Sequence, residues 1–203
     1  MISVEGRGIY ASKTGNIGEW EELTNGLPTG GFSRIDISYS ESYPNVVYAV
    51  YANGRNGYNG NGLGVYKSSN GGKTWTFQGN PESGGVSFSF PWYCLTIGVD
   101  PFDTNQVAVG SVNYGFTKDG GKTWSTADNS HADYHVHAFR KDKPGTFLVG
   151  NDGGIFEYNW SAMNSRSTSL NDGYNVHQVY AGSFTPDSNG VLVGAQDQWS
   201  TYT

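Results

Sequence analysis

One eight-residue sequence occurs twice in this chain with few changes, and it constrains the fold more than any other feature. Residues 68–75 read Ser-Ser-Asn-Gly-Gly-Lys-Thr-Trp, and residues 117–124 read Thr-Lys-Asp-Gly-Gly-Lys-Thr-Trp, 49 positions later. A looser copy runs from Ser12 to Trp20 and is one residue longer. Repetition at such an interval is typical of folds in which similar units pack side by side.

Each copy has the residue types of a tight turn between two strands. An Asn or Asp side chain can accept hydrogen bonds from nearby backbone N–H groups, and the glycine pair supplies positive φ angles. The Thr then re-enters extended structure, and the Trp buries a large ring behind the turn. We therefore expect structural roles for eight residues: Ser68, Asn70, Gly72, Trp75, Thr117, Asp119, Gly121 and Trp124.

Both turns resemble the Asp-box, or bacterial neuraminidase repeat, whose pattern is Ser-x-Asp-x-Gly-x-Thr-Trp. The resemblance implies an all-β fold: a β-propeller of four-stranded antiparallel blades, with each box between the third and fourth strands of a blade. In that family the motif is structural, so it indicates the fold and leaves the activity open.

Short strand-like segments around the turns divide the chain into blades. The pattern predicts half a blade at each end and three whole blades between them: 1–30, 31–79, 80–127, 128–170 and 171–203. The two halves could join and close a four-bladed ring. However, residues 8–12 would already be the third strand of the blade formed by the two halves, and residues 200–203 also have the pattern of a third strand. We therefore favour a partial section of about four blades from a larger propeller.

An open section would expose unpaired strand edges, so we expect the rest of the propeller or another chain as a partner. The net charge of −6 argues against nucleic acid as a partner, and no apolar run is long enough to cross a bilayer. The start of the sequence lacks a basic-then-apolar signal segment. Either a signal was removed, or the chain is an internal piece of a longer protein.

Long polar loops are predicted on one face of the propeller, at residues 53–62, 79–92 and 127–133. Aromatic rings beside amide side chains suit stacking on sugar rings and hydrogen bonding to hydroxyl groups. We therefore predict sugar-binding roles for five residues: Asn53, Tyr58, Trp92, Tyr93 and Asn113. The alternative is that these loops are insertions whose aromatic side chains pack on a neighbouring blade.

Residues 131–137 read His-Ala-Asp-Tyr-His-Val-His. Alternate residues of a strand share a face, so a strand starting this early would align four side chains: His131, Asp133, His135 and His137. Histidine and carboxylate groups together can bind a transition metal. The alternative is a hydrated, hydrogen-bonded channel wall. We expect no other cofactor.

Two aspartates, Asp152 and Asp197, follow the predicted second strands of adjacent blades. Two carboxylates that face one cleft can act on a glycosidic bond as general acid and base, or as acid and nucleophile. The alternative, and the commoner role for such residues, is that each accepts backbone N–H bonds within its own turn.

Residues 99–105, Val-Asp-Pro-Phe-Asp-Thr-Asn, resemble a turn between the first and second strands in xyloglucanase-type glycoside hydrolases. In those enzymes the catalytic aspartates precede a Gly-Gly-aromatic-like segment. Asp152 fits this pattern with one residue fewer, whereas no Gly-Gly pair follows Asp197. The segments around Asp152 and Asp172 also resemble sortilin-type propellers. A sialidase is disfavoured, because its arginine triad and Phe-Arg-Ile-Pro segment are absent.

These features together predict an extracellular or cell-surface, carbohydrate-active propeller that is similar to glycoside hydrolases and binds or cleaves a polysaccharide or other glycan. Whether it is an enzyme is left open. The alternative is a non-catalytic propeller module for protein interaction or surface assembly. A third possibility is a metal-dependent site built on the histidine segment.

Overall fold

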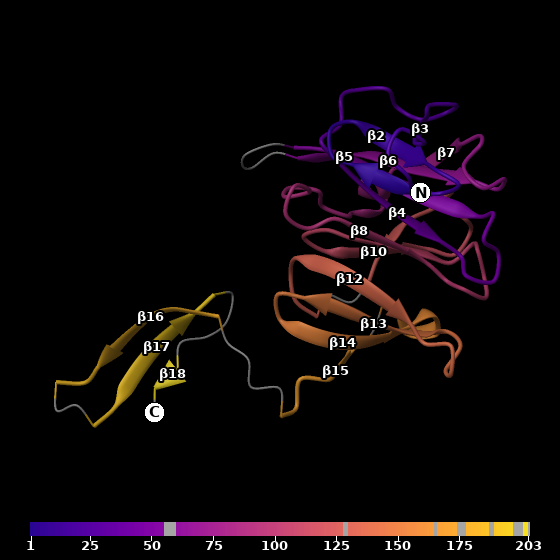
Figure 1. Cartoon of the computed structure of the whole chain (residues 1–203). Coiled ribbons are helices and arrows are strands. Elements are labelled where there is room, and N and C mark those ends of the chain that lie inside the picture. The colour runs from indigo at the N-terminus through magenta and orange to yellow at the C-terminus, as the bar shows by residue number, and fades with distance from the viewer. Residues whose placement is uncertain are drawn as a thin grey trace.

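A computed structural model describes residues 1–54, 60–127, 130–164, 166–173, 178–186, 189–196 and 201–202 of this chain. In these ranges the secondary structure is almost entirely β-strand, with two short 3-10 helices, η1 (Pro81–Gly84) and η2 (Trp160–Ala162). No helix among the described residues has the length and apolar character needed to span a membrane. The strands form antiparallel sheets that follow one another along the chain (Figure 1).

Three sheets of four strands lie in the middle of the chain. Blade 1 contains β4 (Arg34–Tyr39), β5 (Val47–Asn53), β6 (Asn61–Ser68) and β7 (Thr76–Gly79). Blade 2 contains β8 (Thr96–Val99), β9 (Val107–Gly110), β10 (Tyr114–Thr117) and β11 (Ser125–Thr126). Blade 3 contains β12 (Tyr134–Phe139), β13 (Thr146–Asn151), β14 (Gly154–Asn159) and β15 (Thr168–Ser169).

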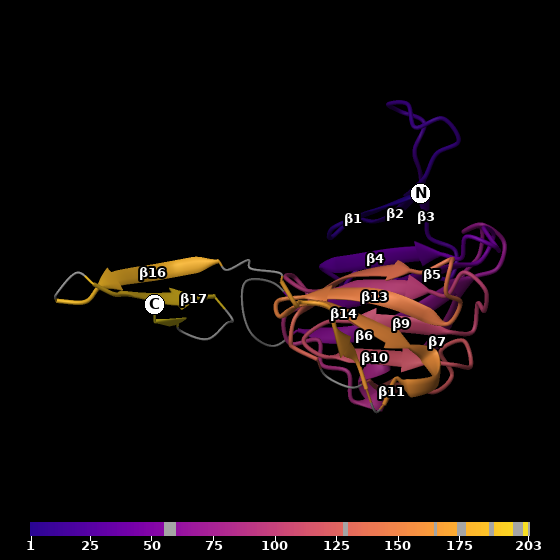
Figure 2. The same cartoon turned by 90° about the horizontal axis from the view of Figure 1, so that it is seen from below.

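A three-stranded sheet lies at each end of the described chain. The first contains β1 (Ile2–Val4), β2 (Gly8–Ala11) and β3 (Glu21–Leu23) and stacks on blade 1. The C-terminal sheet contains β16 (Val179–Phe184), β17 (Val191–Ala195) and β18 (Thr201–Tyr202). Both views show the C-terminal sheet standing apart from the stacked blades (Figures 1 and 2). The prediction of an all-β, partial propeller is therefore confirmed.

The first repeated turn is held by its own side chains. The Ser68 hydroxyl oxygen accepts a hydrogen bond from the Gly72 N–H at 2.8 Å, and Asn70 Oδ1 accepts one from the Thr74 N–H at 3.0 Å. The Trp75 indole N–H donates back to the Gly72 carbonyl at 2.9 Å. Gly72 has φ of 90°, a conformation that other residues adopt only with strain.

The second turn repeats these bonds one for one. The Thr117 hydroxyl oxygen accepts from the Gly121 N–H at 2.9 Å, Asp119 Oδ1 accepts from the Thr123 N–H at 3.0 Å, and the Trp124 indole donates to the Gly121 carbonyl at 3.0 Å. The bonds to Thr123 and Thr117 lower the pKa of Asp119 to about 2. Equal geometry at the two turns follows from their equal sequence.

The hydrophobic core lies between successive sheets. One buried cluster joins blades 1 and 2 and includes Val50, Ile97 and Trp124. A second joins blades 2 and 3 and includes Tyr114, Phe147 and further aromatic side chains. Apolar area removed from water contributes roughly 25 cal/mol per Å², so each blade depends on its neighbour for stability. This stacking brings loops from different blades together at one rim.

Candidate functional site

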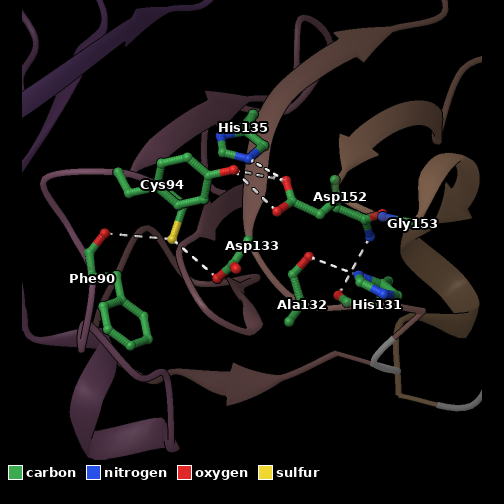
Figure 3. Close-up of polar contacts among 10 residues, drawn as sticks. Phe90, Cys94, His131, Ala132, Asp133, His135, Asp152 and Gly153 are labelled. Atoms are coloured by element: carbon green, nitrogen blue, oxygen red, sulfur yellow. Dashed lines mark hydrogen bonds and ion pairs between the residues drawn. The ribbon is translucent and has the colours of Figure 1, made fainter. Parts of the chain in front are cut away.

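Asp152 follows β13 directly and lies where blade 3 meets the connection that precedes β8 (Figure 3). Its carboxylate pairs with His135 Nε2 at 2.7 Å. The Tyr93 hydroxyl donates to the same carboxylate, at 3.1 Å from Oδ2 and 3.4 Å from Oδ1. Side chains from β12 and from the connection before β8 thus converge on one carboxylate.

A β-bulge directs His135 toward Asp152. Tyr134 pairs with Asn151 and Val136 pairs with Gly150, so His135 is an extra residue on β12. Such an insertion bends the strand and changes the direction of the side chain. Just before it, Asp133 has φ of 63°, a left-handed conformation in which few residues other than glycine occur.

The predicted alignment of the histidine segment on one strand face is therefore not what forms. The strand begins at Tyr134 rather than at His131, and the bulge interrupts the alternation. His131 Nδ1 lies 3.2 Å from the Ala132 carbonyl oxygen, Asp133 contacts Cys94, and His137 contacts Thr96. Among the described residues, no group of three or more His, Cys, Asp or Glu side chains could hold a metal ion.

Cys94 holds the approaching connection against blade 3. Its thiol donates to Asp133 Oδ1 at 3.4 Å and to the Phe90 carbonyl at 3.5 Å (Figure 3). Burial, followed by the negative charge of Asp133, raises the pKa of this thiol to about 12. Cys94 therefore stays protonated near neutral pH and is a structural contact rather than a nucleophile.

Neighbouring amides hold the turn that carries Asp152. Asn151 Oδ1 accepts from the Gly153 N–H at 3.0 Å. Asn171, which follows β15, donates to the Gly153 carbonyl at 3.0 Å and accepts from the Ile155 N–H at 2.9 Å. The shape of this turn therefore does not depend on Asp152 alone, and its carboxylate reaches side chains of other elements.

Two exposed aromatic rings lie next to each other here, and one of them, Tyr93, bonds to the carboxylate. Trp92 is 40% exposed and Tyr93 is 43% exposed, and their ring centroids are 5.9 Å apart. The Tyr93 ring also meets the His135 ring edge-on at 5.0 Å. Arg34 of blade 1 donates to the Trp92 carbonyl at 3.2 Å. We call Trp92, Tyr93, His135 and Asp152 the rim site.

The other predicted binding residues lie elsewhere. Asn113 accepts from the Ser87 N–H at 2.7 Å and donates to the Gly85 carbonyl at 2.9 Å, so its amide holds the segment after η1. Asn53 is exposed at the end of β5. Tyr58 and Asp197 lie outside the described residues.

A polar chain that sequence reasoning missed crosses the inner strands of the three blades. His137 Nδ1 lies 3.2 Å from the Thr96 hydroxyl, and the Asp36 carboxylate accepts from the Ile97 N–H at 2.8 Å. Burial lowers the pKa of His137 to about 4 and raises the pKa of Asp36. The sequence predicted His137 as a candidate metal ligand. Only the stacking of β4, β8 and β12 shows that His137 contacts Thr96 and that Asp36 contacts Ile97.

No protein-family model matches this sequence, and no curated protein sequence matches it. Among solved structures, the chain is similar to an ancestral GH74 enzyme, with a TM-score of 0.55, 15% identity, and coverage of 97% of this chain and 26% of that one. YCF48 from Cyanidioschyzon merolae gives a TM-score of 0.43 at 15% identity, covering 82% of this chain and 55% of that one.

A third similar structure is the GH74 xyloglucanase from Xanthomonas campestris, with a TM-score of 0.43, 12% identity, and coverage of 94% of this chain and 39% of that one. The chain thus spans about a quarter of the length of the ancestral enzyme, 26%. At this identity the likeness to the ancestral enzyme supports the propeller fold alone.

Proposed function

We propose that this chain is a section of an extracellular or cell-surface Asp-box propeller that binds polysaccharide at the rim site. The observation that supports this most is an exposed aromatic pair, Trp92 and Tyr93, in which the Tyr93 hydroxyl donates to the carboxylate of Asp152. The two turns with equal bonding support the Asp-box interpretation.

Sugars need both apolar and polar contacts. The C–H faces of a pyranose ring pack on aromatic rings, and the hydroxyl groups need a small number of well-placed donors and acceptors. The rim site offers the indole of Trp92 as a stacking surface, and Asp152 and His135 as hydrogen-bonding groups held at 2.7 Å from each other. Because these groups come from a stacked scaffold, little ordering is needed upon binding.

Cleavage of the bound glycan is the finer part of the proposal. Asp152 is the candidate acid or base, because the Tyr93 phenol donates to its carboxylate and the His135 imidazole lies 2.7 Å from it. Glycoside hydrolysis requires a second carboxylate. The sequence offers Asp197 for that role, and this residue lies outside the described part of the chain.

The test measures binding and hydrolysis separately on soluble xyloglucan and mixed-linkage β-glucan. Affinity electrophoresis of Trp92→Ala should show about tenfold weaker binding, equivalent to about 1.4 kcal/mol. The matched control is Tyr43→Ala: this tyrosine is also exposed, but it lies in the β4–β5 connection. Equal retardation of the two variants would contradict the proposal.

Hydrolysis is followed by the release of reducing ends. If the chain is catalytic, Asp152→Asn should lower the rate by at least about a hundredfold, the usual contribution of a general acid or base, while binding is kept. Asp172→Asn, an exposed aspartate after β15, serves as the control. If the unaltered chain binds the glycan but does not hydrolyse it, the chain is a carbohydrate-binding module and not an enzyme.

The second candidate function is a protein-binding module that uses the same rim. Trp, Tyr and Arg are the residues most enriched at the energetic centres of protein interfaces, and here Arg34 contacts the backbone of Trp92 beside Tyr93. Absence of retardation by any of the β-glucans would favour this candidate over the first.

A further inference from the structure

The C-terminal sheet carries apolar side chains that nothing covers among the described residues. All six residues of β16 are exposed, and the Phe184 side chain is exposed to 72%. On β17, Leu192 is also exposed. Each Å² of apolar surface left in water forgoes the roughly 25 cal/mol of stabilisation that burial would give. The sheet therefore needs a packing partner.

The pairing of β16 with β17 repeats the pairing of β12 with β13, including the bulge. Val179 pairs with Ala195 and Ala181 pairs with Gly194, which leaves Tyr180 as the extra residue, in the same register as His135 in blade 3. Four apolar residues of the sheet therefore correspond in register to apolar residues of blade 3. Val179 corresponds to Tyr134 and Phe184 to Phe139 on the first strands. Val191 corresponds to Phe147 and Val193 to Val149 on the second strands.

In blade 3 these four places form the surface that packs on blade 2. Tyr134, Phe147 and Val149 are fully or almost fully buried in the cluster that joins the two blades, and Phe139 packs against it. By the same register, the matching face of the C-terminal sheet should pack on whatever lies in the position of the preceding blade.

The outer flank of blade 3 has the matching surface. In strand register, Val136 corresponds to Thr96 of blade 2, Leu148 to Ala108, and Ile155 to Tyr114. The three blade-2 residues are all buried. On blade 3, however, Val136 is 53% exposed and Ile155 is 40% exposed. Leu170, whose N–H donates to the Ile155 carbonyl at 3.0 Å, is exposed beside them. We call Val136, Leu148, Ile155 and Leu170 the blade-3 flank.

One charged residue sits at the border of this flank. Glu157 takes the place of Phe116 of blade 2 in the strand register. Its carboxylate is paired with Arg140 at 3.1 Å and with Lys143 at 2.8 Å. The charge is thus matched within blade 3 and leaves the apolar part of the flank open to a partner.

We propose that the C-terminal sheet of this same chain docks on the blade-3 flank and forms the fourth blade. The connection is long enough, because nine residues separate β15 from β16. The connections between the earlier sheets have ten residues (β3 to β4), sixteen (β7 to β8) and seven (β11 to β12). A covalent connection also gives the sheet an effective concentration in the millimolar range, well above that of a second copy at micromolar concentration.

Docking also extends the rim site to the next blade. Tyr180 occupies the register position of His135, and Gln196 that of Asp152, so the docked sheet presents an aromatic and an amide side chain along the same rim. This consequence rests on the proposed function, whereas the docking itself does not. The docking can therefore be tested without a glycan.

The experiment is amide hydrogen exchange on the whole chain, combined with sedimentation to determine its oligomeric state. In the unaltered monomer, the β16 and β17 amides should exchange at least about a hundredfold more slowly than free peptide. Ile155→Glu should remove most of that protection and leave the amides of β8–β10 unchanged. Ile17→Glu, a substitution at a fully exposed isoleucine in the first sheet's turn, should change neither.

A second variant keeps the test decisive if Ile155→Glu disturbs blade 3. The ring centroids of Tyr114 in blade 2 and Phe147 in blade 3 are 6.4 Å apart. In register, Ile155 corresponds to Tyr114 and Val191 to Phe147, so docking should bring Ile155 and Val191 together. Val191→Lys alone should therefore also expose β16, and the double variant should restore protection through a Glu–Lys pair. Unprotected β16 amides in the unaltered monomer would overturn the proposal, as would protection found only in a dimer.

Discussion

Blade 3 and the C-terminal sheet pair their first two strands in the same register, with the same bulge, yet their second strands differ in burial. Phe147 of blade 3 is fully buried, whereas Val191 at the same register position is partly exposed. Backbone pairing is thus satisfied in both sheets, and among the described residues only blade 3 buries its apolar face against a neighbouring sheet. Strand pairing and stability are separate properties in this fold, because the apolar faces are buried between blades.

The largest expected effect tests the buried side of this comparison. Phe147→Ala should lower the free energy of unfolding by about 3–5 kcal/mol, because it leaves a cavity among the aromatic rings between blades 2 and 3. Val191→Ala at the matching position should cost about 1 kcal/mol or more if the sheet docks, and close to nothing if it stays exposed. Urea unfolding followed by tryptophan fluorescence measures both.

A middle-sized effect concerns His137, whose place in the C-terminal sheet is taken by Gly182. Burial lowers the pKa of His137 to about 4 in the folded chain, below its usual value of 6.5. The unfolded chain then binds the proton first, so stability should be lost as the pH falls from about 6.5 to about 4. The loss should reach roughly 3 kcal/mol at most.

His137→Gln should flatten this part of the profile, which urea unfolding at a series of pH values can measure. Asp36 acts in the opposite direction, because burial raises its pKa and the folded chain gains relative stability when that carboxyl is protonated. The comparison is therefore made with Asp36 intact. A profile that keeps its slope in His137→Gln would assign the loss to other groups.

The smallest expected effect compares the two repeated turns. Asp119→Ala removes bonds to Thr117 and Thr123 and should cost about 1 kcal/mol, the usual net value of a hydrogen bond. Asp119→Asn should cost less, because Asn70 makes the corresponding bonds in the first turn. Since the pKa of Asp119 is lowered to about 2, this contribution should fade as the pH drops below about 3.8 toward 2, and only in the second turn.

The sequence predicted the turns well because every contact that defines them lies within eight residues. Asn70 and Asp119 accept backbone N–H bonds within their turns, as expected. The alignment that the sequence allowed for the histidine segment does not form, because alternation along a strand assumes a regular strand. Asp133 is in a left-handed conformation and His135 lies in a bulge, and neither is visible in the residue pattern.

By itself, then, the sequence determined the all-β repeat, the hydrogen bonds that Asn70 and Asp119 accept within its turns, and the position of Asp152 directly after a strand. Only the tertiary structure decided that Asp152 meets His135 and Tyr93, residues 17 and 59 positions away in the chain. The physical reason is that turn bonds are local, whereas the rim site depends on how two blades stack and on one inserted residue that turns a side chain toward its partner.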